Sequence, residues 1–415
     1  MLPLYPAILI RYFRIMRKIQ ADYIFPISAD PIKNGILICN DDGTILEIIN
    51  PLKTLDAFED VEIVKGILCP GFVNAHCHLE LSHLRGKITE KQGMANFISE
   101  LLQQRFQISE DEQQQIFKDA ENEMLQNGIV AVGDISNNLS TLAIKQKGKI
   151  YYHTFVEILG LDPALAPTKL KEGKLLQEQF KNAATGNASI VPHAPYTVSP
   201  ALLNLINEYE TDTLLSIHMQ ESQAEIDFCM NRTGDIAELF TRLKFDFSHS
   251  QPSACRPIQQ VLNHLTSKSN ISLVHNTYTK REEIKWANEL HKNLFWCLCP
   301  NANIYIENRL PEVMNFIKED SKIIVGTDSL ASNYQLSVLE ELKTISNAFP
   351  EIDLNTLLKW STINGAAFLR IENKFGSFEK GKRPGVVLVE NVDLEKLILK
   401  SNSIMFPIQF KATIH

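Results

Sequence analysis

The chain has 415 residues, of which 44% are hydrophobic, so it is long enough for one large folded core and a smaller second one. Its formal net charge of −8 comes from 49 acidic and 41 basic residues, without long runs of one sign. This balance argues against a nucleic-acid groove or an anionic membrane surface as partner. It favours a small or neutral substrate.

The N-terminal stretch MLPLYPAILIRYFRIMRK has its basic residues after a short apolar run, which is the wrong order for a secretory signal. The run is also too short to span a bilayer, so we interpret residues 1–20 as an N-terminal extension and expect no membrane partner. Seven cysteines without framework spacing predict reduced thiols in a cytoplasmic protein. The sequence leaves a homodimer open.

Residues 21–66 consist of short runs of Ile, Val and Leu separated by turn residues, a texture typical of β-structure. The tail from residue 376 to residue 415 returns to turns and strands. We therefore predict that residues 21–66 and 376–415 together form a small β-sandwich domain built from both ends of the chain.

Between these segments, residues 67–375 contain eight short apolar runs, each followed by a helical pattern or a loop. Helical spacing is clearest in ANFISELLQQRF, EEIKWANELHK and SVLEELKTISNAF. Eight strands alternating with helices predict an α/β fold, a TIM-like (β/α)8 barrel. The eight runs are ILCPGFVNAH, GIVAVGD, IYYHTFVEIL, SIVPH, TLLSIH, ISLVH, LFWCLCP and KIIVGTD.

Five of the eight runs end in residues that can bind a metal or move a proton. In such barrels the carboxyl ends of the strands converge on one mouth. Side chains on a strand repeat every second residue, so both rings of an H-x-H strand end face the same side. Neutral imidazoles with one carboxylate suit Zn²⁺, and less exclusively Fe²⁺ or Mn²⁺. A single strand-end histidine is more often structural, but burying all of these unpaired would be costly. The residues are His76, His78, His193, His218, His275 and Asp328.

Glu221 follows the fifth run, three residues after His218. A carboxylate beside a metal site is well placed for general acid/base chemistry, although a glutamate near a helix start is also favoured by the helix dipole. The other histidines read as surface or structural residues, with His83 in the first mouth loop as the exception to watch. Whether His83 or Glu80 contacts substrate is not decided by the sequence.

Six motifs resemble, in order, those of the amidohydrolase superfamily, and within it the deaminase and chlorohydrolase branch. The resemblance covers nearly everything from Ala21 onward and includes the return into the β domain from Asn364. The motifs are PGFVNAHCH, VPHAPYTVSP, IHMQES, LVHNTY, CPNANIY and GTDSLASN.

This resemblance implies one divalent metal ion, Zn²⁺ or Fe²⁺, held by His76, His78, His218 and Asp328. No lysine ends a strand where binuclear members carry a modified one, which favours a single metal. The resemblance also implies that Glu221 is the proton shuttle and that His275 and Asp328 act on the attacking water. His193 would face the substrate.

The implied reaction is hydrolytic deamination of an aminated purine or purine nucleoside. The tryptophan that grips the nucleoside in S-adenosylhomocysteine deaminases is absent from GKITEKQGMANFISELL, so aminodeoxyfutalosine is the first named candidate. A chlorohydrolase or a cyclic-amide hydrolase remains an alternative, because the same site chemistry serves each. A more remote alternative is a barrel without catalysis that serves as a scaffold.

Overall fold

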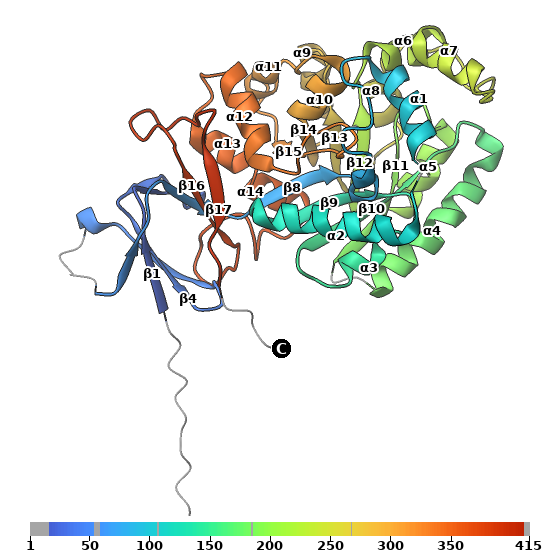
Figure 1. Ribbon diagram of the computed structural model, residues 1–415. Helices are drawn as coiled ribbons and strands as arrows, with labels where there is room; N and C mark the ends of the chain where they lie inside the picture. Colours follow the sequence, from blue (N-terminus) through green and yellow to red (C-terminus); the bar gives the residue numbers. More distant parts are fainter. Residues whose placement is uncertain (1–15, 54–58, 106–107, 184–185, 267, 411–415) are drawn as a thin grey trace, which may run out of the picture.

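The computed structural model describes residues 16–53, 59–105, 108–183, 186–266 and 268–410. It contains a barrel and, beside it, a pair of small sheets (Figure 1). Of the N-terminal extension predicted at residues 1–20, residues 1–15 lie outside this description. The remaining part, Met16–Gln20, forms strand β1 of a small sheet, and its Ile19 is buried.

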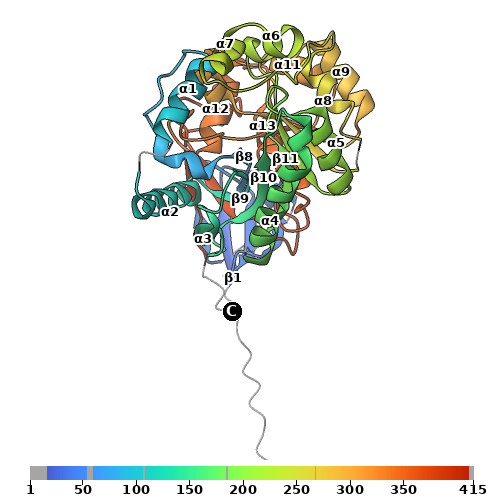
Figure 2. The same ribbon diagram turned by 90° about the vertical axis from the view of Figure 1, so that its right-hand side faces the viewer.

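Eight consecutive parallel strands form the barrel, and helices surround them (Figure 2). Each of the eight predicted runs contributes one of these strands. The strands are β8 (Phe72–Cys77), β9 (Ile129–Ser136), β10 (Tyr151–Ile158), β11 (Asn187–Pro192), β12 (Leu214–Met219), β13 (Asn270–His275), β14 (Leu294–Leu298) and β15 (Ile323–Val325).

The eight strands form two hydrogen-bonded halves, one from β8 to β11 and the other from β12 to β15. Further backbone hydrogen bonds join these halves on both sides. On one side, the backbone N–H of His218 donates to the carbonyl of His193 at 2.9 Å. On the other side, the N–H groups of Thr327 and Asp328 both donate to the carbonyl of His76 at 3.1 Å. The predicted (β/α)8 fold is thereby confirmed.

The helices lie on the outside of the strands, and the three clearest helical patterns of the sequence correspond to α1, α9 and α12. Among the described residues, no helix has the length and apolar character needed to cross a membrane. The helices are α1 (Met94–Gln104), α2 (Glu110–Gln126), α3 (Leu142–Lys145), α4 (Ala166–Ala183), α5 (Pro200–Tyr209), α6 (Gln223–Asn231), α7 (Asp235–Arg242), α8 (Pro257–Leu262), α9 (Arg281–Leu290), α10 (Pro300–Glu307), α11 (Val313–Lys318), α12 (Val338–Ala348), α13 (Leu354–Trp360) and α14 (Ile363–Phe368).

Two small sheets pack against each other beside the barrel. One has the strand order β5-β4-β1-β6 and the other β17-β16-β7-β2-β3, so the second sheet combines both ends of the chain. A separate cluster of buried side chains, including Leu37, Leu68 and Leu388, fills the space between them. The strands not yet given are β2 (Tyr23–Ile24), β3 (Ile32–Lys33), β4 (Ile36–Asn40), β5 (Ile45–Ile49), β6 (Val61–Ile63), β7 (Ile67–Pro70), β16 (Val386–Glu390) and β17 (Ile404–Pro407).

The first apolar run, which the sequence presents as one strand, is divided at Gly71. Its first part is β7, which pairs with β16 in the small sheet, and its second part is β8 of the barrel. A Cβ at Gly71 would lie 2.4 Å from Val130 and 2.7 Å from the carbonyl oxygen of Pro384. Only glycine allows the chain to pass at this point from one sheet to the other.

A buried ion pair supports the end of β8. The ammonium group of Lys145 lies 2.6 Å from Asp134 Oδ2, and both side chains are 0% exposed. Lys145 also donates to the hydroxyls of Ser136 and Thr154, at 2.9 and 3.1 Å. The other oxygen of Asp134 accepts the backbone N–H of Leu79 at 2.8 Å. Because Leu79 follows His78, the pair fixes the backbone at this histidine.

We expect Lys145→Met to lower the free energy of unfolding by about 3–5 kcal/mol, because it leaves the Asp134 carboxylate buried without its cation. The double variant Asp134→Asn/Lys145→Met retains an acceptor for Leu79 and removes the charge, so it should lose less. Urea unfolding followed by circular dichroism measures both. Equal losses in the two variants would contradict this account.

Candidate metal centre

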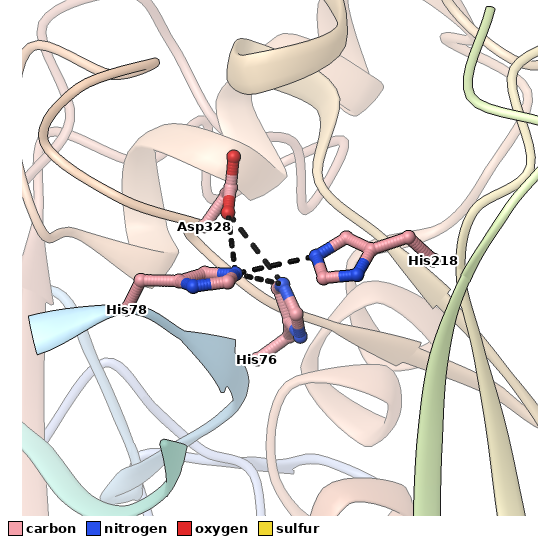
Figure 3. A group of neighbouring side chains, drawn as sticks. All are labelled: His76, His78, His218 and Asp328. Atoms are coloured by element: carbon pink, nitrogen blue, oxygen red, sulfur yellow. Dashed lines mark hydrogen bonds and ion pairs between the residues drawn. The ribbon is translucent and has the colours of Figure 1, made fainter. Parts of the chain in front are cut away.

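Four side chains converge at the carboxyl ends of the barrel strands (Figure 3). His76 and His78 come from the end of β8, His218 from β12, and Asp328 from the segment after β15. The Nε2 atom of His78 lies 3.1 Å from that of His76 and 3.2 Å from that of His218. Asp328 Oδ1 lies 3.5 Å from His76 Nε2 and 3.4 Å from His78 Nε2.

The chemistry of this donor set fits a divalent metal ion. Zn²⁺ binds histidine nitrogens at about 2.0–2.1 Å, which puts two nitrogens of a tetrahedral site about 3.3 Å apart. The observed separations of the Nε2 atoms agree with this value. The Nδ1 atom of His218 lies 2.9 Å from the carbonyl oxygen of His193, so Nδ1 carries the proton and Nε2 keeps its lone pair for a metal.

Asp328 reaches the histidines because its chain segment passes very close to β8. A Cβ at Gly326 would lie 2.7 Å from the Cβ of His76, so a larger residue would push the segment away. Asp328 itself has a φ of +56°, a left-handed conformation that is unusual for a side-chain-bearing residue. The hydroxyl of Ser332 donates to Asp328 Oδ2, leaving Oδ1 toward the histidines.

Burial sets the protonation of the cluster. It lowers the pKa of His218 to about 3 and that of His78 well below its ordinary value, so both rings are neutral at physiological pH. Burial alone would raise the pKa of Asp328, but His76 and the other nearby histidines lower it below its ordinary value. Neutral imidazoles and an ionised carboxylate are the forms that bind a metal.

Glu221 and His275 face each other beside the cluster, with Glu221 Oε1 3.5 Å from His275 Nε2. His275 Nδ1 lies 2.9 Å from Asn303 Oδ1 and therefore carries the ring proton. Burial raises the pKa of Glu221 well above its ordinary value, and the charge of Asp328 raises it further. Burial also lowers the pKa of His275 to about 4. Burial therefore favours the uncharged form of both members of the pair.

The carboxylate of Glu225 shapes the loop that carries Glu221. Its two oxygens accept the backbone N–H groups of Gln220 and Glu221, at 2.8 and 3.0 Å. The hydroxyl of Ser222 in turn accepts the N–H of Glu225 at the start of α6. Glu225 thus serves the loop and the helix, while Glu221 is left facing the cluster.

A cavity of about 580 Å³ opens above the cluster. Of the five histidines expected at the barrel mouth, all except His76 line this cavity. His193 lines it, with Nδ1 held at 2.8 Å from the hydroxyl of Thr197. Burial lowers the pKa of His193 to about 4, so it too is neutral. His83 is buried away from this cavity, and its Nε2 lies 3.0 Å from the carbonyl oxygen of Arg105, which is a structural contact.

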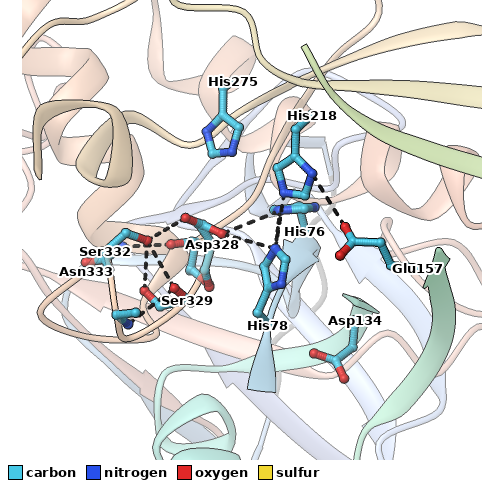
Figure 4. A network of polar contacts seen from close by, with 12 residues as sticks. His76, His78, Asp134, Glu157, His218, His275, Asp328, Ser329, Ser332 and Asn333 are labelled. Carbon is cyan, nitrogen blue, oxygen red and sulfur yellow. Dashed lines mark hydrogen bonds and ion pairs between the residues drawn. The ribbon is translucent and has the colours of Figure 1, made fainter. Parts of the chain in front are cut away.

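Sequence reasoning missed three polar residues beside the centre: Glu157, Asn137 and Arg105. All three line the cavity. Glu157 follows the apolar core of the third run and lies beside His218 (Figure 4). The only signal was a carboxylate near the end of an apolar strand. Glu80 does not line the cavity; its Oε1 accepts from Arg105 at 3.0 Å.

Comparisons with known proteins find deaminases among the similar sequences and structures. Adenosine deaminase from Helicobacter pylori is 26% identical over 322 residues, which cover 76% of this chain and 77% of that protein. Among solved structures, Helicobacter pylori aminofutalosine deaminase in complex with methylthio-coformycin superposes with a TM-score of 0.75 at 23% identity, over 90% of this chain and 92% of that one. An adenosine deaminase from Xanthomonas campestris with bound zinc gives a TM-score of 0.69 at 21% identity, over 91% and 85% of the two chains.

The sequence model of the amidohydrolase family matches residues 67–414, which include all eight barrel strands and the four converging side chains. The chain belongs to the amidohydrolase family.

Proposed function

We propose that this chain is a metal-dependent hydrolase that removes the amino group from an aminated purine ring, most directly a purine nucleoside. The observation that carries the proposal is the buried group of three imidazoles and one carboxylate, with the Glu221–His275 pair beside it at the floor of a cavity. The names of the relatives, which include adenosine deaminase and aminofutalosine deaminase, support the reaction class.

In this proposal His76, His78, His218 and Asp328 hold one divalent metal ion, with Zn²⁺ as the first choice and Fe²⁺ as the second. The donor chemistry supports both ions, and the zinc in the Xanthomonas campestris structure supports the first. When bound, such an ion lowers the pKa of a coordinated water so that it can act as a nucleophile near neutral pH.

The protein groups move the protons of the reaction. Asp328, ionised, and His275, with a free Nε2 lone pair, take the proton that the attacking water loses. Glu221, whose pKa burial raises well above its ordinary value, gives a proton to the ring nitrogen next to the amine-bearing carbon and then assists the departure of ammonia. One carbon–oxygen bond forms and one carbon–nitrogen bond breaks, so water enters and ammonia leaves.

The substrate occupies the cavity above the centre, with His193 facing it. Aminodeoxyfutalosine is the first compound to test, because a structure similar to this chain is that of an aminofutalosine deaminase. Phe97 and Tyr196 line the cavity and can stack on a purine in place of the tryptophan that the chain lacks. The remaining volume leaves space for a substituent on the base.

Replacing Glu221 by Gln should reduce kcat by about 10²–10⁴-fold while metal content stays unchanged, because the proton donor is lost and the four metal-binding residues remain. Steady-state rates and metal analysis on the same sample measure both. Glu289→Gln, an exposed carboxylate on α9, is the matched control and should behave as wild type. A Glu221→Gln enzyme with near wild-type turnover would assign Glu221 a structural role.

Removing the metal with a chelator should abolish turnover, because the three imidazoles and Asp328 alone supply no nucleophile. Adding Zn²⁺ or Fe²⁺ should restore activity at one equivalent per chain. Protein purified without chelators that holds no transition metal and gains none from either ion would favour the scaffold reading instead.

Ammonia release from a panel of adenine-bearing nucleosides, aminodeoxyfutalosine, aminated pyrimidines and triazines identifies the substrate. We expect at least one adenine-bearing compound to reach a kcat/KM of about 10⁴ M⁻¹s⁻¹ or more, the range of enzymes on their own substrates. Chloride release or ring opening without ammonia would instead identify a chlorohydrolase or a cyclic-amide hydrolase.

A further inference from the structure

We propose that Glu341 of α12 is a positioning residue that holds the loop carrying Asp328 and the helix that orients His275 in one fixed arrangement. The inference rests on the proposed function, in which Asp328 and His275 take the proton of the attacking water. It assigns a role to a buried carboxyl group that does not line the cavity and therefore acts through other residues.

Glu341 connects two parts of the chain that meet at the mouth of the barrel. It is 0% exposed and lies where α12 packs against α10 (Figure 1). Its Oε1 accepts hydrogen bonds from Nδ2 of Asn333 at 2.7 Å and from Nδ2 of Asn301 at 3.0 Å. Its Oε2 accepts the backbone N–H of Asn301 at 2.9 Å. Because Asn301 is the second residue of α10, one carboxyl group joins the start of this helix to the loop after β15.

The first connection runs through Asn333 to the loop that carries Asp328. The Nδ2 atom of Asn333 also donates to the carbonyl oxygen of Thr327 at 2.9 Å. Its Oδ1 accepts the N–H of the following residue at 2.8 Å, so the NH₂ group must face Glu341. Thr327 directly precedes Asp328, and Asn333 directly follows Ser332, whose hydroxyl donates to Asp328 Oδ2 (Figure 4). Both ends of the loop are thereby tied to Glu341.

The second connection runs through α10 to His275. Asn303 lies two residues after Asn301, and its Oδ1 is 2.9 Å from Nδ1 of His275. The Nδ2 atom of Asn303 lies 3.4 Å from the carbonyl oxygen of His275. The hydroxyl of Thr344 on α12 donates to Asn301 Oδ1 at 2.6 Å, so the NH₂ group of Asn301 faces Glu341. The position of α10 sets the orientation of the His275 ring, and Glu341 fixes the start of α10.

A carboxyl group is an unfavourable choice for this position if packing is its only purpose. Burial raises the pKa of Glu341 to about 8, and the three N–H donors act against this rise. An apolar side chain would fill the same space without such a cost. It would, however, leave two amide groups and one backbone N–H without their acceptor. The hydrogen bonds are therefore what Glu341 contributes.

Anchoring the start of α10 does not by itself account for these contacts. A carboxyl group near a helix N-terminus is favoured by the helix dipole, and one contact to the backbone N–H of Asn301 would be enough for that purpose. Instead Oε1 of Glu341 is shared between α10 and Asn333. A movement of either the helix or the loop breaks a hydrogen bond at this shared oxygen, so the two parts are held relative to each other.

The first test is Glu341→Gln, which keeps the shape of the side chain but offers one acceptor oxygen in place of two. Either the backbone N–H of Asn301 or the amides of Asn301 and Asn333 must then lose their acceptor. At saturating Zn²⁺ we expect kcat to fall by about 10- to 100-fold with KM nearly unchanged, and the Kd for Zn²⁺ to rise by a similar factor. Glu340→Gln, which removes the neighbouring carboxylate paired with Lys343, is the control and should change none of these values.

Two further variants each remove one connection and keep Glu341. Asn333→Ala should weaken Zn²⁺ binding, because it releases the loop of Asp328. Asn301→Ala should lower kcat about fivefold, the equivalent of one hydrogen bond, with Zn²⁺ affinity unchanged. In the double variant with Glu341→Gln, Asn333→Ala should add little to the loss of affinity, since both changes remove the same connection. These single variants also test the inference if Glu341→Gln does not fold.

The visible absorption of cobalt-loaded protein reports the metal environment without any substrate. We expect Glu341→Gln and Asn333→Ala to change this spectrum and Glu340→Gln to leave it unchanged. Variants that lose thermal stability but keep wild-type Zn²⁺ affinity, cobalt spectrum and kcat would overturn the inference, as would losses that simply add in the double variant. A wild-type protein that binds Zn²⁺ but releases no ammonia from any purine would contradict the proposed function alone, because affinity and spectrum still test Glu341.

Discussion

The metal centre depends on one backbone contact that closes the barrel. The carbonyl oxygen of His76 accepts hydrogen bonds from both Thr327 and Asp328, at 3.1 Å each. This contact joins the first barrel strand to the segment after the last one, and Gly326 permits it because a Cβ there would meet His76. Ligands from opposite ends of the chain are brought together in this way. Asp328 has a left-handed backbone conformation, which is unfavourable for a residue with a side chain. The conformation persists because the surrounding chain holds the segment in place.

Burial, which is unfavourable for charged groups, shifts the pKa values of the groups in this site in different directions. Removing water lowers the pKa of His275 to about 4 and raises that of Glu221 above its ordinary value. Neighbouring side chains then reverse the effect for one group, because the histidines around Asp328 lower its pKa despite burial. The pKa values of two carboxyl groups in one cavity are thereby shifted in opposite directions, up for Glu221 and down for Asp328. Such a separation is the usual basis for acid and base roles in enzymes.

The sequence predicts the strands and the strand-end residues well because both follow from local pattern: apolar runs of strand length, and costly polar residues at their carboxyl ends. It does not predict that the first run is divided at Gly71, because the division depends on Val130 and Pro384, which approach only in the folded chain. The sequence does not predict the position of Glu157 beside the centre for a related reason. Its place beside the centre results from its contacts with Asn137 and His218, which come from different parts of the chain.

The sequence motifs do not determine the substrate, because the residues proposed to carry out the reaction differ from those that would bind the rest of the substrate. In the proposed reaction the metal-binding residues, Glu221 and His275 would act on any carbon that carries a leaving group beside a ring nitrogen, so the same chemistry suits the release of different groups. Discrimination must therefore come from parts of the cavity that do not touch the reacting carbon. In this chain those parts include an apolar wall around Phe97 and polar side chains such as His193 and Asn137. An apolar wall distinguishes related substrates only weakly, whereas a buried polar group strongly rejects a ligand that leaves it unpaired. Substrate choice is accordingly expected to depend more on the polar side chains of the cavity than on its apolar wall.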